Sequence, residues 1–344
     1  MWLLTLLVPT GRDHRGNKET VAPGISQNMR RTLVFLLLVF GSGAWANEPA
    51  CGQPGTRYSG PMIDAMAQIE SGMFNTVSRA MDSSGVTRMA LFARLHRKRN
   101  GEADVLSLKK RYPERFFMGT PKPFDQGGDL STWFVNQTIS HVQDERYQFI
   151  GELLFAHADK SHGEQTATGE RYVAPDGKNV FKLLSATEQR RIPIMLHWEV
   201  YDWGRDWPAF HALYSRFPGV TFIWPHAGFA SHEQVLTVLS SHSNVMVTLS
   251  KKEKFPDSLS NEEKSELLGE AIVDSCGKLL REWRDLLGKY PDRFMFATDA
   301  HKDSRWGKYE KIVEQWRFIL GQLPDPLAQS LAWRNAERTY TMPR

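Results

Sequence analysis

The sequence predicts a single α/β domain of the (β/α)8 TIM-barrel type, and three observations lead to that prediction. Short apolar runs rich in β-branched and aromatic residues recur eight times between residues 62 and 299. Stretches with helical periodicity, such as 130–147 and 270–290, separate most of these runs. No glycine-rich phosphate loop follows the first run, which disfavours the alternative, a doubly wound open sheet.

The predicted strands follow one another at spacings that leave room for a helix, except for the closely spaced first pair. They cover residues 62–69, 86–93, 115–120, 149–156, 192–199, 220–226, 244–250 and 293–299. Three junctions share an aromatic residue and a proline, which ends the preceding helix: Tyr112-Pro113, Phe217-Pro218 and Tyr290-Pro291. Eight strands and their helices fit the typical barrel length of about 250 residues.

Residues 1–46 are expected to lie outside this domain. Met29-Arg30-Arg31 begins a positively charged segment, residues 33–40 are apolar without interruption, and Ala44-Trp45-Ala46 is a cleavage pattern. Eight apolar residues are too few to span a bilayer, so no stable membrane anchor is expected. We therefore expect an upstream extension, a cleaved signal peptide that starts at Met29, and a secreted or periplasmic domain at 47–344. A short apolar helix is the alternative for this segment.

Composition limits the classes of function. The chain has 344 residues and a formal net charge of +4, which is too weak to suggest nucleic-acid binding. Two cysteines exclude a disulfide scaffold and a multi-cysteine metal site. An oxidising compartment would permit a disulfide between Cys51 and Cys276 without requiring one. The expected partner is a small-molecule substrate, and the oligomeric state is left open.

Titratable side chains gather at the ends of predicted strands four to eight. Glu152 and His157 belong to strand four, His197 to strand five, His226 to strand six and Asp299 to strand eight. In a barrel these ends meet at one rim, where active sites form. A packed barrel has no structural need for a ring of titratable groups, so their convergence predicts a functional site.

Three of these strand ends also resemble a known family. Leu196-His197-Trp198, Pro225-His226-Ala227-Gly228 and Ala297-Thr298-Asp299 resemble strands five, six and eight of the amidohydrolase superfamily, and more narrowly its amidohydrolase-2 branch of lactone hydrolases and decarboxylases. Ile63-Asp64-Ala65 and Asn335-Ala336-Glu337-Arg338 resemble the first strand and the C-terminal helix of that branch. The resemblance runs from about residue 60 to the C-terminus.

One departure from the family concerns metal binding. The resemblance implies two histidines at the end of the first strand, where this chain has Met66 and Gln68. Neither side chain replaces imidazole as a ligand for zinc or manganese. A binuclear site is therefore not expected. One divalent zinc or manganese ion on His197, His226 and Asp299, with Glu152 as a further ligand, and a metal-free centre both stay open.

The favoured function is hydrolysis of a small, anionic amide, ester or lactone. Asp299 is expected to accept the proton of the attacking water, while His197 and His226 polarise the carbonyl oxygen. Residues expected to bind the substrate are Glu152, His157, Lys160, Arg171, Trp198, Lys251 and Lys302. Arg94 fits either that role or a solvated surface, and the polar loop before Val173 fits a lid. A carboxy-lyase and a degenerate, non-catalytic ligand-binding barrel are the alternatives.

Overall fold

The structure is a computed structural model that describes residues 55–96, 99–122, 130–157, 171–250, 271–274, 276–301 and 303–341. The chain divides into two compact units, Met1–Ala50 and Cys51–Arg344, and every described residue belongs to the second. The predicted upstream extension and signal peptide therefore lie outside the described residues. Cys276 is disulfide-bonded. The other cysteine of the sequence, Cys51, lies outside the described residues.

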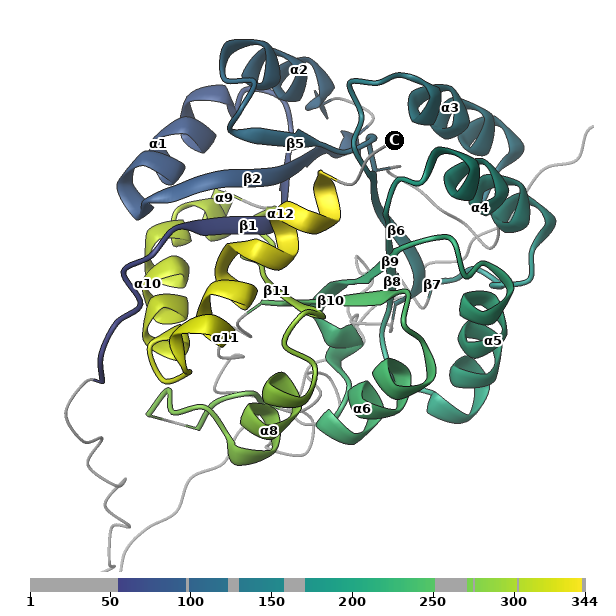
Figure 1. The fold of residues 1–344 in the computed structure, drawn as a ribbon. Helices are drawn as coiled ribbons and strands as arrows, with labels where there is room; N and C mark the ends of the chain where they lie inside the picture. The colour runs from purple at the N-terminus through teal and green to yellow at the C-terminus, as the bar shows by residue number, and fades with distance from the viewer. Residues whose placement is uncertain are drawn as a thin grey trace, which may run out of the picture. The chain divides into compact units, whose positions relative to one another are not determined.

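The second unit has an α/β fold whose main strands are parallel (Figure 1). Each of these strands overlaps one of the apolar runs predicted from the sequence, because β-branched and aromatic residues pack well in buried parallel strands. They are β1 (Met62–Ile69), β2 (Val86–Ala93), β5 (Phe116–Met118), β6 (Ile150–His157), β8 (Ile194–Trp198), β9 (Phe222–Trp224), β10 (Val245–Leu249) and β11 (Phe294–Phe296).

The strands form two principal sheets. One has the order β1-β2-β5, and the other has the order β11-β10-β9-β8-β6-β7. Isolated parallel bridges connect their edges at Ala67–Ala300 and at Gly119–Phe149. Three short strands were not predicted: β3 (Leu95–His96) and β4 (Arg99–Asn100) pair with each other, and β7 (Arg171–Tyr172) runs antiparallel to β6.

A hydrophobic cluster lies on the inner side of the strands. It includes at least one residue from, or directly beside, each of the parallel strands: Ile63, Ala90, Phe117, Phe149, Met195, Ile223, Met246 and Met295. Met66, one of the two residues in place of the family histidines, is fully buried in this cluster. The Tyr340 hydroxyl closes the cluster by donating to the Ala65 carbonyl over 2.7 Å.

Helices lie around the outside of the strands in Figure 1. They are α1 (Phe74–Ser84), α2 (Glu102–Arg111), α3 (Thr132–Gln143), α4 (Lys178–Arg190), α5 (Trp203–Arg216), α6 (His232–Ser241), α8 (Arg281–Lys289) and α10 (Tyr309–Leu320). The helices α2, α5 and α8 end two residues before a proline, as the shared junctions predict. Every described helix is too short or too polar to cross a membrane.

The helical prediction for 270–290 was too long. The described residues before Arg281 form a turn, in which Val273 and Leu279 make an antiparallel bridge. The Asp274 carboxylate accepts hydrogen bonds from the backbone of Cys276 and Lys278 at 2.9 and 2.8 Å. Side chains of this kind compete with the helical backbone for hydrogen bonds, so helix α8 begins only after the turn.

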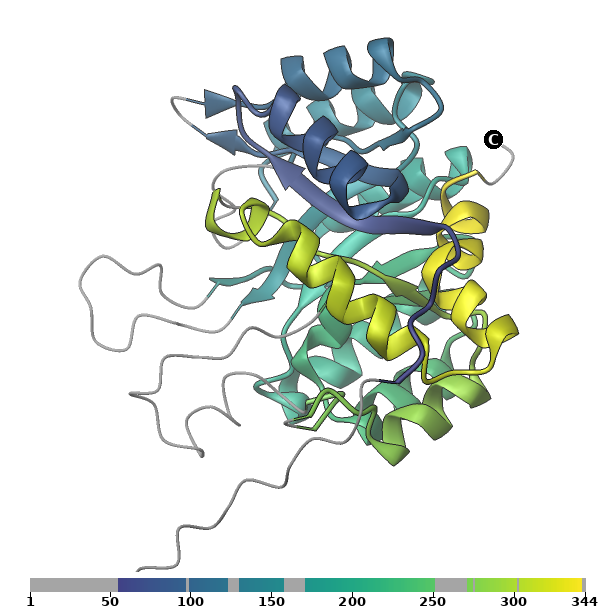
Figure 2. The same ribbon diagram turned by 90° about the vertical axis from the view of Figure 1, so that its left-hand side faces the viewer.

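The two ends of the main strands face different surroundings. The C-terminal elements α11 (Asp325–Gln329), η2 (Ser330–Arg334) and α12 (Asn335–Tyr340) lie at the end where the strands begin. The Asn335 amide donates to the carbonyl of Phe294, the first residue of β11. The short strands β3, β4 and β7 project at the opposite end (Figure 2). This end carries the candidate site.

Candidate active site

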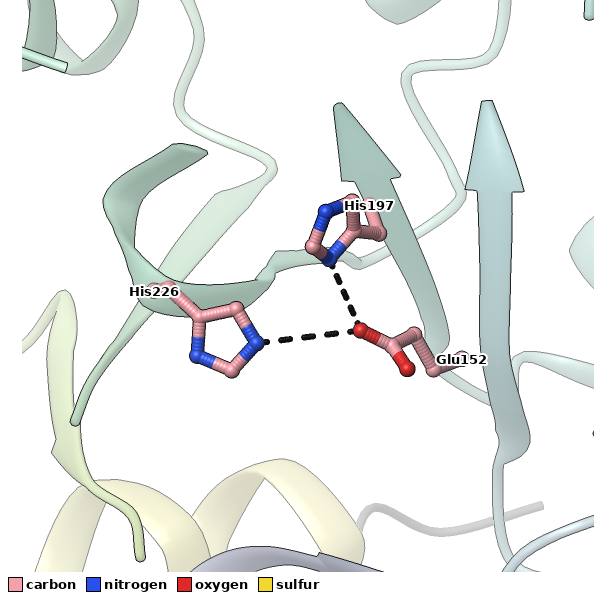
Figure 3. A group of neighbouring side chains, drawn as sticks. All are labelled: Glu152, His197 and His226. Carbon is pink, nitrogen blue, oxygen red and sulfur yellow. Dashed lines mark hydrogen bonds and ion pairs between the residues drawn. The ribbon is translucent and has the colours of Figure 1, made fainter. Parts of the chain in front are cut away.

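Four titratable side chains, each from a different parallel strand or the loop after it, come together at one end of the strands. Glu152 lies on β6 and His197 on β8, whereas His226 stands two residues after β9 and Asp299 three residues after β11. His197 Nδ1 lies 2.8 Å from Glu152 Oε1. His226 Nε2 lies 3.7 Å both from Glu152 Oε1 and from Asp299 Oδ2. Figure 3 shows Glu152, His197 and His226 pointing toward one another. The expected convergence of His197, His226 and Asp299 is therefore present.

His226 is held on a left-handed turn. Residues His226, Ala227, Gly228 and Phe229 all have φ between +53° and +58°. At Gly228 a Cβ atom would lie 2.5 Å from the Trp198 carbonyl oxygen and would also meet the Trp224 ring, so only glycine fits there. His226 Nδ1 lies 2.9 Å from the Ser250 hydroxyl. The opposite ring nitrogen, Nε2, therefore faces the carboxylates.

Asp299 is also strained, with φ at +50°. Its backbone amide donates to the Met66 carbonyl of β1 over 3.0 Å. The preceding residue, Thr298, is fixed by the buried Asp64 carboxylate, which accepts from the Thr298 amide at 2.9 Å and from its hydroxyl at 2.6 Å. Such strain persists only where the surroundings over-determine the backbone, and it often marks functional sites. Asp64 thus positions Asp299 from the far end of β1.

Sequence reasoning missed several groups that surround these four side chains. The Lys122 ammonium contacts Glu152 Oε2. The Gln68 amide nitrogen donates to Glu152 Oε2 and to Asp299 Oδ1, at 3.1 Å each. Glu199 Oε1 lies 3.2 Å from His197 Nε2, and His301 Nδ1 lies 3.4 Å from Asp299 Oδ2. Glu199 and His301 stand two residues after His197 and Asp299, so a search of each strand end to that depth would have found them.

Electrostatic pairing sets the protonation of the centre. Burial alone would raise the pKa of Glu152, but Lys122 and His197 outweigh it and hold that pKa well below its ordinary value. Burial would lower the pKa of His197, yet Glu152 and Glu199 raise it to about 9. Burial is likewise outweighed at Asp299, whose pKa is lowered by His226 and His301. At neutral pH both carboxylates are ionised and His197 is a cation.

Of the residues expected to bind the substrate, some are described by the structure and others lie outside the described residues. His157 Nε2 lies 3.7 Å from Glu199 Oε1, and its ring stacks on His197 with 5.9 Å between centroids. Arg171 pairs with His157 across β7 and β6, so it lies beside the same centre. The Arg94 guanidinium donates to the His301 carbonyl over 3.2 Å. Lys160, Lys251, Lys302 and the residues 158–170 of the predicted lid lie outside the described residues.

Trp198, which was expected to bind the substrate, lies in the core instead. Trp198 is fully buried, and its ring stacks on Phe210 and Trp224 with centroids 4.3 and 4.8 Å apart. Its indole nitrogen donates to the Tyr214 hydroxyl over 2.9 Å. Successive side chains of a strand point to opposite faces. Since His197 points inward, Trp198 packs against helix α5 and contacts no substrate.

The structure also tests which residues could hold a metal ion. Ligand atoms of Glu152, His197 and His226 lie within 4.8 Å of one another, so Glu152 replaces Asp299 in the expected set. A Glu-His-His set is a known zinc arrangement. However, both His197 nitrogens face carboxylates, and Glu152 Oε2 already contacts Lys122 and Gln68. Metal ligands need free lone pairs, so a metal ion here would have to break the His197–Glu152 contact and would lie close to the Lys122 ammonium.

Comparisons with known proteins show the family and the fold. The family model described as Amidohydrolase matches residues 149–342. Comparison with curated proteins found no matching sequence. An amidohydrolase from Burkholderia multivorans with bound HEPES has a similar fold, with 15% identity and a TM-score of 0.50 over 83% of this chain and 100% of that one.

A second solved structure with a similar fold is a probable 2-pyrone-4,6-dicarboxylic acid hydrolase from Acinetobacter baumannii with citric acid bound. It is 11% identical, with a TM-score of 0.51 over 81% of this chain and 98% of that one. At such identities the likeness shows the fold alone. The family match is stronger, because it covers more than half of the 344 residues and includes Glu152, His197, His226 and Asp299. This chain therefore belongs to the amidohydrolase family.

Proposed function

We propose that the protein is a hydrolase of a small, anionic amide, ester or lactone. One observation carries the proposal: the ionised Asp299 carboxylate and the His226 ring meet at strand ends with 3.7 Å between Oδ2 and Nε2. That separation is longer than a hydrogen bond, so the N–H of His226 remains available to a substrate oxygen. A base and a hydrogen-bond donor at this spacing suit the addition of water to a carbonyl group.

In the proposed reaction, the oxygen of water bonds to the acyl carbon. Asp299 accepts the proton of the water, and His226 donates a hydrogen bond to the carbonyl oxygen as it becomes anionic. Collapse of the tetrahedral intermediate breaks the acyl C–N or C–O bond, and the leaving group takes up the proton from Asp299. Both nitrogens of His197 are engaged by Glu152 and Glu199, so His197 acts through its positive charge.

Two lines of evidence support an anionic substrate. Arg171 and His157 lie in register at the ends of β7 and β6 beside His197, and Arg94 lies beside His301, so cationic and hydrogen-bonding groups flank the centre. The neighbour from Acinetobacter baumannii is named for a lactone that carries two carboxylates, and it binds citric acid. Arginine suits carboxylates because its planar fork makes paired hydrogen bonds.

We also propose that the parallel strands close into a barrel and that the domain at 47–344 is exported. Two observations support closure: the bridges at Ala67–Ala300 and Gly119–Phe149, and an inner hydrophobic cluster to which every parallel strand contributes. The disulfide at Cys276 supports an oxidising compartment. N-terminal sequencing of the exported protein should find a chain that starts after Ala46, whereas a retained Met29 would contradict cleavage.

The function is tested by screening lactones, anilides and aryl carboxylates with the wild type and with Asp299→Asn. Loss of the base should lower kcat by about 10²- to 10⁴-fold in a variant that remains folded, although it loses the ionic contacts of Asp299 with His226 and His301. Asp303→Asn alters an exposed residue of helix α9 (Asp303–Trp306) and is the matched control with full activity. Full activity of Asp299→Asn would exclude this mechanism. Release of carbon dioxide from an aryl carboxylate would identify a lyase, and binding without turnover a ligand-binding barrel.

A further inference from the structure

Lys122 is built into the centre. The residue follows β5, and its backbone bridges to Arg94 at the end of β2. Its amide donates to the Ala93 carbonyl over 2.7 Å, and its carbonyl accepts from the Leu95 amide over 3.0 Å. The side chain is 12% exposed and contacts Glu152, which is 3% exposed. A lysine this deeply placed needs a partner, and Glu152 is that partner.

Gln68 occupies the second key position. Its side chain is buried, and its amide nitrogen lies 3.1 Å from one oxygen of Glu152 and 3.1 Å from one oxygen of Asp299. The backbone is fixed on both sides, since the Gln68 amide donates to the Ala300 carbonyl over 2.7 Å and its carbonyl accepts from the Trp306 indole over 3.1 Å. Gln68 therefore connects two carboxylates that would otherwise repel each other.

These two side chains already perform what a metal ion does between acidic ligands. Lys122 supplies a full positive charge to Glu152, and Gln68 supplies a hydrogen-bond donor to both carboxylates. A divalent ion bound to Glu152 would lie close to the Lys122 ammonium in a region with little water, where repulsion between like charges is strong. Binding a metal ion therefore has an electrostatic cost here.

We propose that Lys122 and Gln68 take the place of the metal ion, so that this centre is assembled and works without one. This inference concerns the site of the proposed hydrolase. It rests on the proposed function only for the claim that the centre works without a metal ion, and the claim about metal binding does not depend on turnover. Lys122 and Gln68 act through Glu152 and Asp299, so they are positioning residues. Removing the ammonium should free Glu152, His197 and His226 to bind zinc, because their ligand atoms already lie within 4.8 Å of one another.

The experiment measures zinc and manganese binding by the untagged, full-length protein. Wild type incubated with excess ZnCl₂ or MnCl₂ and then dialysed should retain less than about 0.1 equivalents of metal, in keeping with the poor fit of its donors. Lys122→Met should bind zinc at least about tenfold more tightly than wild type, as expected when a like charge is removed. Lys122→Arg, which keeps the charge, should resemble wild type. Lys182→Met, at an exposed lysine of α4, is the matched control.

Zinc affinity is measured by competition with a chromophoric chelator and checked by thermal shift, so neither readout needs a substrate. Stoichiometric metal in wild type that disappears in Glu152→Gln would overturn the proposal, and so would a folded Lys122→Met that binds zinc no better than wild type. Gln68→His is the second variant, and it too should gain zinc affinity. If no substrate is ever turned over, the proposed hydrolase fails while these binding results still decide the role of Lys122 and Gln68.

Discussion

The buried Asp64 should make the stability of this protein depend on pH in a way that one substitution removes. Its carboxylate accepts hydrogen bonds from the Met66 and Thr298 amides at 3.2 and 2.9 Å. The Thr298 and Tyr309 hydroxyls add two more at 2.6 and 2.9 Å. Burial nevertheless outweighs these four donors and raises the pKa of Asp64 from 3.8 to about 6. The folded protein therefore binds a proton at Asp64 more tightly than the unfolded chain does.

The magnitude follows from the difference between the folded and unfolded states. A shift of about two pKa units corresponds to about 3 kcal/mol. Because the folded-state pKa is raised, the favourable contribution is complete below about pH 4 and is lost as the pH rises through about 6. Asparagine cannot ionise, so the unfolding free energy of Asp64→Asn relative to that of wild type should rise by about 3 kcal/mol as the pH increases from 3.5 to 7.5. In addition, Asp64→Asn should lose about 1–3 kcal/mol of stability at every pH, because the amide nitrogen of asparagine donates where a carboxylate oxygen accepted.

Urea denaturation of both proteins at several pH values measures this difference directly. Asp82→Asn, at an exposed aspartate that pairs with Arg115, is the control for replacing a carboxylate by an amide at the surface. The reasoning is refuted if the stability difference between wild type and Asp64→Asn stays constant across the range. Asp64→Asn should also lower kcat, because Thr298 holds the backbone that presents Asp299.

Two further predictions concern the turn after β9 and a buried histidine. Gly228→Ala should destabilise the fold by about 3 kcal/mol, because alanine is strained at a φ of +58° and its Cβ would crowd Trp224. Urea denaturation measures this loss, and wild-type stability would show that the turn can relax. Burial and His211 lower the pKa of His242 to about 4, so stability should fall as the pH drops from about 6.5 to 4, by about 1–2 kcal/mol after solvent screening. His242→Gln should lack this loss, and an equal loss in the variant would assign it to another group.

Much of the fold could be predicted because its signals are local. Each parallel strand is an apolar run between turn residues, and Pro113, Pro218 and Pro291 mark where helices end. The two-residue strands β3, β4 and β7 could not be predicted, since alternation needs more residues to become visible. The start of α8 was missed for another reason. The Asp274 side chain binds the local backbone there, and periodicity does not report such competition.

The site was predictable to the extent that strand ends define it. His197, His226 and Asp299 follow directly from where the parallel strands stop. The orientation of Trp198 also follows from alternation, because its neighbour His197 points inward. The place of Lys122 in the site could not be predicted from the sequence. This lysine stands four residues after Met118, the last residue of β5, and only the backbone bridge to Arg94 turns it toward Glu152.

Gln68, which stands where the family resemblance implies a histidine, and Lys122 are linked through the charge of Glu152. With Gln68 but no lysine, the buried Glu152 would keep a neutral donor and the His197 cation but lose the ammonium beside Oε2. That loss is costly in a region with little water. With Lys122 and two first-strand histidines, a metal ion and an ammonium would compete for the same carboxylate. Lys122 and Gln68 together stabilise the charge of Glu152 and connect it to Asp299. We therefore expect Gln68→His and Lys122→Met to change zinc affinity non-additively when they are combined.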